Sequence, residues 1–195
     1  MQRNMVGGLS FRRYDRGGAP AVSQGFTLVE LIVTLTVAGI LAAVAIPWMS
    51  SFIIRTRVSG NVNEFIAATM LARSEAIQRN GAVTICRSTG AETGSNACDT
   101  GASDWSSGWL VFVGTTATGP TAGTILARQG AFPAGTAITP ATVATSITYN
   151  ANGVPLSAPP TSFAFTSGGF SRTVCFSPSG RTSALAVGST SGCPT

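Results

Sequence analysis

Hydrophobic residues follow three different patterns along the chain, and each pattern predicts a different kind of element. From Phe26 to Met49 the chain is almost uniformly apolar, and this 24-residue run contains one acid, Glu30, and no Lys, Arg or Asp. A helix needs about 20 such residues to cross a bilayer. Gly39 and Pro47 interrupt the run, and because a proline removes one backbone hydrogen bond from a helix, we expect a kink near Pro47.

Beyond Pro47 the pattern becomes amphipathic, with apolar residues at three- and four-residue steps, as in a helix with one buried face. The expected apolar stripe comprises Val58, Val62, Phe65, Ile66, Thr69, Met70, Ala76 and Ile77. Glu75 and Arg79 form an (i, i+4) pair off this stripe. Asn80-Gly81 is typical of a helix C-cap, so the sequence predicts one helix from Phe26 to about Arg79 that packs its second half under another layer.

From Ala82 onward the hydrophobic period is two, which predicts β-strands. The expected strands are Ala82–Arg87, Gly108–Val113, Thr124–Arg128, Thr145–Tyr149, Ser162–Thr166, Arg172–Phe176 and Arg181–Val187. Turns are expected at Asn152-Gly153, Gly168-Gly169 and Pro178-Ser179-Gly180. The predicted fold class is α+β, with a long N-terminal helix packed against a C-terminal antiparallel β-domain.

Composition supports a β-rich, loop-rich domain, because the chain has 23 glycines and only 10% charged residues. The formal net charge of +5 is unevenly placed. Four of the twelve arginines (Arg3, Arg12, Arg13, Arg16) precede Gly25 against one acid, and eight arginines against six acids follow it. The small excess of arginines over acids after Gly25 is too weak to argue by itself for nucleic-acid binding. The basic segment before the apolar run predicts that this end stays in the cytoplasm and that the C-terminal part is exported.

All four cysteines, Cys86, Cys98, Cys175 and Cys193, follow the apolar run. An even number confined to the exported part indicates disulfides in an oxidising compartment, and metal binding is the competing interpretation. Three pairings are possible. We favour Cys86–Cys98 and Cys175–Cys193, because each closes a short segment rich in Gly, Ser and Thr.

Two ordinary interpretations of the apolar run remain open. It could be a secretory signal removed at Ala43-Val44-Ala45, although it is longer than the usual 7–15-residue core and has an acid near its start. It could also be a plain membrane anchor. Neither explains why Gly25, Phe26 and Glu30 occur together.

The string Gly25-Phe26-Thr27-Leu28-Val29-Glu30-Leu31 resembles the prepilin signature of type IV pilins and type II secretion pseudopilins. This resemblance implies that a prepilin peptidase cleaves the leader, residues 1–25, after Gly25 and N-methylates Phe26. It also implies that Glu30 pairs with the free N-terminus of a neighbouring subunit. A carboxylate is the natural partner of an ammonium group in an apolar setting.

Two further strings resemble the GspH/FimT (FimU-like) pseudopilin family: Ala72-Arg73-Ser74-Glu75-Ala76, and Trp105-Ser106-Ser107-Gly108-Trp109-Leu110-Val111-Phe112. The resemblance divides the chain into the leader, an assembly half of the helix over residues 26–49, an amphipathic half over 50–80, and a periplasmic domain over 81–195. From alternation alone, Trp109, Val111 and Val113 share one face of a strand, which we interpret as core and not as a binding platform.

The residue inventory argues against an enzyme. The chain has no His and no Lys, which removes the commonest general base, Schiff-base lysines and histidine-containing metal sites. Glu92, Asp99 and Asp104 could bind Ca²⁺ but lack EF-hand spacing, so solvated loop acids are the better interpretation. We expect no catalytic residues, no metal and no cofactor.

DNA capture is the functional alternative. Some FimT members bind DNA through a G-R-x-R loop, and the corresponding positions here are Gly180-Arg181-Thr182-Ser183, which keep the first arginine and replace the second by Ser183. Phosphate binding relies on several cationic contacts. Arg172 or Arg128 could supply the missing charge if the fold brings one of them close to Arg181.

The sequence therefore predicts a minor pilin or pseudopilin, a single-pass inner-membrane protein whose C-terminal domain is periplasmic and which assembles with other pilins in a filament. The expected partners are those pilins, the prepilin peptidase, the inner membrane and, in the alternative, DNA. Whether the filament is a type IV pilus or a type II secretion pseudopilus stays open.

Overall fold

The computed structural model describes residues 25–101, 104–186 and 192–193, and its first element is the helix α1, Leu28–Gln78. The chain forms two compact units that divide within α1, the first ending at Val44 and the second beginning at Ala45. The helix is not interrupted at Gly39 or at Pro47. It therefore has the length that the sequence predicts, and its backbone remains helical through the proline.

The helix ends in a capping motif at Asn80 and Gly81. The Gly81 N–H donates to the Ala76 carbonyl at 3.1 Å, and the Asn80 N–H donates to the Ile77 carbonyl at 3.2 Å. This is the hydrogen-bond pattern of a Schellman motif. Asn80 takes the left-handed conformation, with φ of 49°, so the asparagine and not the following glycine reverses the chain.

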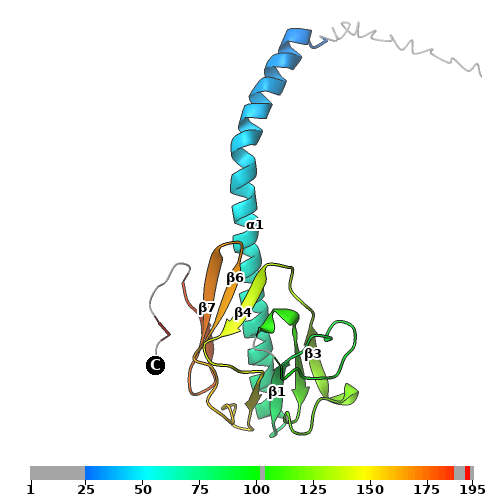
Figure 1. The fold of residues 1–195 in the computed structure, drawn as a ribbon, viewed down its shortest axis with the longest axis vertical. Coiled ribbons are helices and arrows are strands. Elements are labelled where there is room, and N and C mark those ends of the chain that lie inside the picture. The colour runs from blue at the N-terminus through cyan, green and yellow to red at the C-terminus, as the bar shows by residue number, and fades with distance from the viewer. Residues whose placement is uncertain (1–24, 102–103, 187–191, 194–195) are drawn as a thin grey trace, which may run out of the picture. The chain divides into compact units, whose positions relative to one another are not determined.

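The described residues of the second unit form eight strands: β1 (Val83–Arg87), β2 (Trp109–Val113), β3 (Ile125–Gln129), β4 (Thr136–Pro140), β5 (Ser146–Tyr149), β6 (Ser162–Ser167), β7 (Phe170–Phe176) and β8 (Thr182–Ala184). They form two antiparallel sheets, ordered β3-β2-β1-β5 and β4-β6-β7-β8. Two short 3₁₀ helices, η1 (Trp105–Ser107) and η2 (Ala122–Thr124), precede β2 and β3. Both sheets pack on the C-terminal half of α1 (Figure 1), as the α+β prediction requires.

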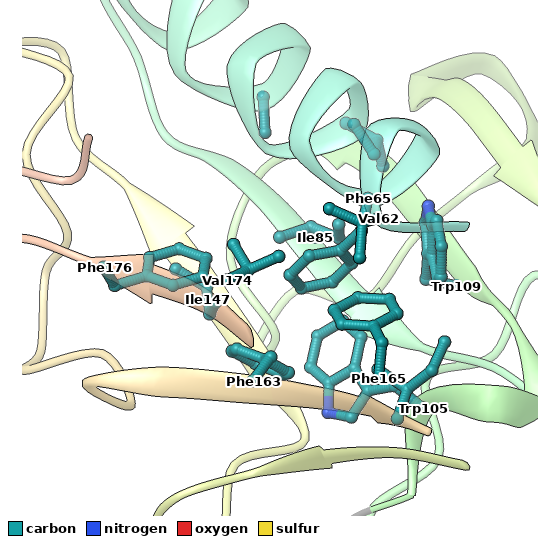
Figure 2. Packing of buried hydrophobic residues seen from close by; sticks show 14 of the residues in the cluster. Val62, Phe65, Ile85, Trp105, Trp109, Ile147, Phe163, Phe165, Val174 and Phe176 are labelled. Atoms are coloured by element: carbon teal, nitrogen blue, oxygen red, sulfur yellow. The ribbon is translucent and has the colours of Figure 1, made fainter. Parts of the chain in front are cut away.

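The core between α1 and the two sheets is centred on Phe65. Its ring lies 5.7 Å from Trp105, 5.3 Å from Trp109, 4.8 Å from Phe163 and 5.5 Å from Phe165, measured between centroids. Figure 2 shows these rings converging from the helix and from both sheets. Aromatic pairs in edge or tilted arrangements add stabilisation beyond the area that they bury. Trp109 and Val111 are buried in this cluster and Val113 packs against it, so the tryptophan strand is core, as predicted.

The predicted helix stripe needs a correction. Met70 and Ile77 are 58% and 50% exposed, whereas Ala68 and Ala72, which the pattern did not include, are buried. Ala68, Ala72 and Ala76 belong to the buried core, whereas the larger side chains of Met70 and Ile77 are exposed.

The strand prediction missed β4. This strand pairs with β6 at the edge of its sheet, with Ile138 opposite Phe165 and Pro140 opposite Phe163. Proline is tolerated on an edge strand, but in a sequence it argues against a strand. The last predicted strand is shorter than expected, because β8 ends at Ala184; Val187 lies outside the described residues.

Candidate functional site

The N-terminal motif lies at the start of α1 and is open to its surroundings. Gly25 and Phe26 precede the first helical residue, Leu28, and the Phe26 side chain is 83% exposed. A Cβ added to Gly25 would meet no atom within 4 Å, and the backbone there is not in the left-handed region. The packing of this chain therefore does not require a glycine at position 25.

Thr27 caps the N-terminus of the helix and thereby places Glu30 in the first turn. The Thr27 carbonyl accepts the Leu31 N–H at 3.1 Å, and the Thr27 hydroxyl oxygen accepts the Glu30 N–H at 3.2 Å. Glu30 is thus the third residue of the first turn, where the free N–H groups and the helix dipole favour a negative charge. The capping role of Thr27 was not predicted from the sequence, although Thr-x-x-Glu is the signature of a capping box.

The helix surface that follows Glu30 is strongly apolar and unburied. An 18-residue stretch of α1 is strongly apolar, and none of it is buried. Among the described residues, α1 is the one helix long and apolar enough to cross a membrane. The large exposed side chains on this part of the helix are Leu31, Ile32, Val33, Leu35, Val37, Ile40, Leu41, Val44, Ile46, Trp48, Met49, Phe52 and Ile53.

Both favoured cysteine pairs are bonded in the structure. Cys86 on β1 is joined to Cys98, and Cys175 on β7 is joined to Cys193. The first bond closes a loop over the face of the first sheet that points away from α1, where Cys86, Ala91, Leu110 and Phe112 form a second apolar cluster. The second bond attaches the C-terminal segment to the second sheet.

Two of the three acids around the first disulfide, Asp99 and Asp104, accept hydrogen bonds from the protein. Asp99 accepts the Thr89 N–H and lies 3.6 Å from the Arg87 guanidinium. Asp104 accepts the N–H and hydroxyl of Ser106 and the N–H of Ile138. No group of three or more potential metal ligands occurs in the described part of the chain, and Glu92 packs against Gly130.

Asp104 links η1 to the edge strand β4. Burial alone raises the pKa of its carboxyl, but the hydrogen bonds from Ile138 and Ser106 and the charge of Arg87 outweigh burial and lower the pKa below 3.8. The ionised form is therefore part of the native structure.

The turn before β8 carries Gly180 and Arg181. Gly180 has φ of +78°, and a Cβ there would lie 2.8 Å from Pro155 and 2.9 Å from Tyr149, so this glycine is required by packing. The Tyr149 hydroxyl points at the Gly180 carbonyl at 3.5 Å, and burial raises the pKa of Tyr149 well above its usual range while Arg73 opposes the shift. Arg181 is exposed at the end of the turn.

The two predicted helper arginines donate to other groups in the domain. Arg172 donates to the Ser59 hydroxyl at 3.1 Å and to the Leu185 carbonyl at 3.3 Å. Arg128 donates to the Ser95 carbonyl at 2.6 Å in the first disulfide loop. The cation that does share a hollow with Arg181 is Arg73, together with Met70, Gly180 and Thr182. Arg73 is fixed by a 2.9 Å hydrogen bond from its Nε to the Gly153 carbonyl.

Two family matches cover most of the chain. Residues 61–180 match the family described as type II transport protein GspH. Residues 21–46 match the prokaryotic N-terminal methylation motif. The second match contains the capped helix start and much of the exposed apolar surface, and the first contains the last part of α1 and most of the strands.

Curated relatives match only a short stretch of the chain. A fimbrial protein of Pseudomonas aeruginosa is 40% identical over 55 residues, which are 28% of this chain and 36% of that protein. A type IV major fimbrial protein FimA of Dichelobacter nodosus is 46% identical over 43 residues, which are 22% of this chain and 27% of that protein. The chain thus spans about a third of the length of the curated relatives that it matches.

Solved structures resemble the fold over about two thirds of the chain. Two crystal forms of the type IV minor pilin FimU of Pseudomonas aeruginosa superpose with TM-scores of 0.50 and 0.52. The matches cover 66% and 69% of this chain and 92% of the FimU chain, at 22% and 23% identity. At this identity the likeness shows a shared fold, a long N-terminal helix followed by antiparallel sheets.

Proposed function

Because the chain belongs to the GspH family of type II transport proteins, we propose that it is a minor pilin or pseudopilin, incorporated at low copy into a type IV pilus or a type II secretion pseudopilus. Family membership supports a structural subunit of such a filament. The role needs no catalytic group, metal or cofactor, because its chemistry is association between helices.

One observation carries the proposal: a capped helix start with Glu30 in its first turn leads directly into an apolar surface that is not buried by any of the residues that the structure describes. An uncovered apolar surface of this length is unstable in water and needs a bilayer or neighbouring helices. A subunit that is first anchored in the inner membrane and then enters a helix bundle would meet the bilayer and the neighbouring helices in turn.

Cleavage after Gly25 would create the assembly contact. The leader, residues 1–25, would be removed by a prepilin peptidase, leaving Phe26 as the N-terminal residue, which the same enzyme would methylate. Gly25 supports this step because the chain's own packing makes no use of it. A glycine that the fold does not need is explained by an enzyme that must approach the backbone closely.

Glu30 would then receive the ammonium group of a neighbouring subunit. An isolated carboxylate in a bilayer costs about 2.5–3.5 kcal/mol or more. Pairing with a cation, in addition to its place in the first helical turn, would offset this cost. Residues 26–49 would form the assembly half of the helix, and residues 50–80 the half that carries the domain of residues 81–195.

The proposed location is the inner membrane, crossed once, with the C-terminal domain in the periplasm. The disulfides support an oxidising compartment. The arginines before Gly25 support a cytoplasmic N-terminus. Other pilins of the same filament are the proposed partners, and the genes beside this one would distinguish a pilus from a secretion pseudopilus.

Mass spectrometry of the mature N-terminus tests the proposal. We expect a chain that begins at Phe26 and carries one methyl group on its amine. Gly25→Ala is the sharpest variant, because an alanine fits the space and any loss of processing then reports the peptidase. An intact leader, or cleavage near Ala45, would contradict the proposal.

DNA binding is a second candidate that one observation favours: Arg181 is exposed and shares a hollow with Arg73. Two neighbouring cations make a small phosphate site, although specific DNA binders use more contacts. The whole chain in detergent should retard duplex DNA at low salt, and Arg181→Ala should weaken this while Arg79→Ala, an arginine paired with Glu75 at 2.6 Å, should not. Equal loss in both variants, or no retardation by the unmodified chain, would contradict a site at Arg181.

A further inference from the structure

A group of aromatic and basic side chains lies where the apolar run of α1 gives way to the β-domain. Trp48 and Phe52 are 81% and 65% exposed, and Arg55 and Arg57 are exposed as well. Trp48, Phe52 and Arg55 are separated by four and three residues, so they share one face of the helix, and with Ser51 they line a common hollow. We call Trp48, Phe52, Arg55 and Arg57 the collar.

The order of side chains in the collar matches a membrane boundary. No charged residue occurs between Glu30 and Arg55. Tryptophan prefers the level of the lipid headgroups, and Arg55 lies about 10 Å farther along the helix axis than Trp48. A headgroup layer is about 5–8 Å thick on each side of the hydrocarbon, and long arginine side chains can reach back toward it.

The tip of the β6–β7 hairpin lies against the same part of the helix. Gly168 and Gly169 form its two-residue turn, with φ of +53° and +83°, the backbone of a tight hairpin turn. A Cβ on Gly168 would lie 2.8 Å from the Ile54 side chain, so the backbone of the tip lies directly on the helix. The Arg55 guanidinium carbon is 4.5 Å from the centroid of the Phe170 ring. The hairpin therefore holds Arg55 in place, and Arg55 marks the level of the hairpin tip.

We propose that the collar binds the anionic headgroups of the outer leaflet of the inner membrane before the subunit enters a filament, and that this contact holds the β6–β7 tip at the membrane surface. The inference rests on the proposed single-pass anchoring. The argument for lipid as the occupant is continuity: the collar directly extends the exposed apolar surface of α1, its tryptophan suits the interface, and its two arginines complement phosphate. A polybasic contact with an anionic surface is worth about 1 kcal/mol per arginine, which is about a fivefold change in a two-state docking equilibrium.

Tryptophan fluorescence in nanodiscs provides the test, because the other tryptophans are shielded: Trp105 is 0% and Trp109 is 2% exposed. In the unmodified chain, lipids brominated in the acyl chain should quench Trp48, and Trp48→Phe should remove that quenching. The double variant Trp48→Phe/Phe170→Trp then places the reporter at the hairpin tip and keeps an aromatic ring for Arg55.

The tip reporter should be quenched by a lipid with a nitroxide on its headgroup at least twofold more in discs containing phosphatidylglycerol than in discs of phosphatidylcholine alone. Adding Arg55→Gln and Arg57→Gln should abolish this difference, and Arg79→Gln should leave it unchanged. Hydrogen exchange over residues 167–171 of the chain with native tryptophans should slow in the anionic discs, which gives a readout free of the Phe170 substitution.

Equal quenching in both lipids, or quenching that does not depend on the two arginines, would overturn the headgroup contact. Cells that carry Arg55→Gln/Arg57→Gln give a second check. If quenching is unchanged but filament incorporation is lost, the arginines bind a protein partner, and the headgroup contact is overturned. Failure of brominated lipid to quench Trp48 in the unmodified chain is a different result, because it would contradict the membrane anchoring itself.

Discussion

At the residue scale, Phe65 is the helix residue around which the aromatic core of the β-domain is packed. Phe65 is fully buried and meets aromatic rings from η1, β2 and β6. Met70, one and a half turns later, is an apolar side chain of similar size but is 58% exposed. The two residues lie on one helix and differ in burial, which makes them a matched pair.

We predict that Phe65→Ala lowers the free energy of unfolding by about 3–5 kcal/mol, the usual cost of a cavity left by a buried phenylalanine. Met70→Ala should cost less than about 1 kcal/mol, since exposed substitutions have small effects. Urea denaturation followed by the fluorescence of the buried tryptophans measures both. Similar losses for the two variants would mean that the core is not centred on Phe65.

Asp104 gives a prediction about pH. Its pKa in the native state lies below the unfolded value of 3.8, so its ionised form contributes stability that is present above pH 3.8 and is lost as the pH falls through the native pKa. Asp104→Asn should therefore flatten the fall in unfolding free energy between about pH 5 and pH 2.

Glu64→Gln is the control for this pH measurement, because Glu64 is exposed on α1. The unfolding free energy of Glu64→Gln should fall more steeply at low pH than that of Asp104→Asn. Denaturant midpoints across the pH series report the result. A profile of Asp104→Asn that superposes on that of the unmodified chain would show that the carboxylate is not coupled to folding.

At the scale of elements, the first disulfide loop acts as a cover for the outer face of the first sheet. Arg128 on β3 donates to the Ser95 carbonyl, Cys86 and Cys98 are bonded, and Leu110 and Phe112 are buried beneath the loop. The bond and the arginine thus hold the same loop from two sides.

Replacing Cys86 and Cys98 by serine should lower the unfolding free energy by about 2–4 kcal/mol, the usual range for a loop of this size. Arg128→Ala should then destabilise the disulfide-free domain more than the oxidised one, because only the arginine would still hold the loop. Denaturation of the four variants forms a double-mutant cycle. Additive losses would contradict a loop held jointly by the two contacts.

Sequence pattern predicted the elements that rest on local rules. The helix end at Asn80, the Glu75–Arg79 pair and seven of the eight strands follow from capping, i,i+4 spacing and alternation. The fourth strand was missed because its proline lies on a sheet edge, where a rule against proline in strands does not apply. Met70 and Ile77 were misassigned because a helical period does not tell which residues of a broad apolar face the sheets cover.

The arginines show the same limit. Arg172 and Ser59 are 113 residues apart in sequence and are joined by a hydrogen bond, while Arg181 shares its hollow with Arg73 on the helix. Such neighbours depend on how the second sheet packs on α1, and no local spacing encodes that. Thr27 is the opposite case, because its capping signature was visible in the sequence and was overlooked.

At the scale of the whole molecule, the chain divides its tasks between two units that can be perturbed separately. The β-domain has a closed core and two disulfides, whereas the first part of α1 leaves its apolar surface uncovered. A change in the first turn of α1 should therefore affect assembly without affecting the stability of the domain.

Glu30→Gln is the variant that isolates the charge. The amide keeps the length of the side chain and Thr27 still caps the helix through the Glu30 backbone N–H, so membrane insertion and domain stability should be unchanged. If the carboxylate receives the ammonium group of a neighbour, incorporation into sheared filaments should fall at least tenfold, since removing one partner of a buried ion pair leaves the other charge unpaired at a cost of about 3–5 kcal/mol. Thr27→Ala is the contrasting variant: it removes a cap worth about 1 kcal/mol and keeps the charge, so it should reduce incorporation far less. Immunoblots of sheared filaments and of membrane fractions measure both steps, and normal incorporation of Glu30→Gln would show that the filament is held together without this charge.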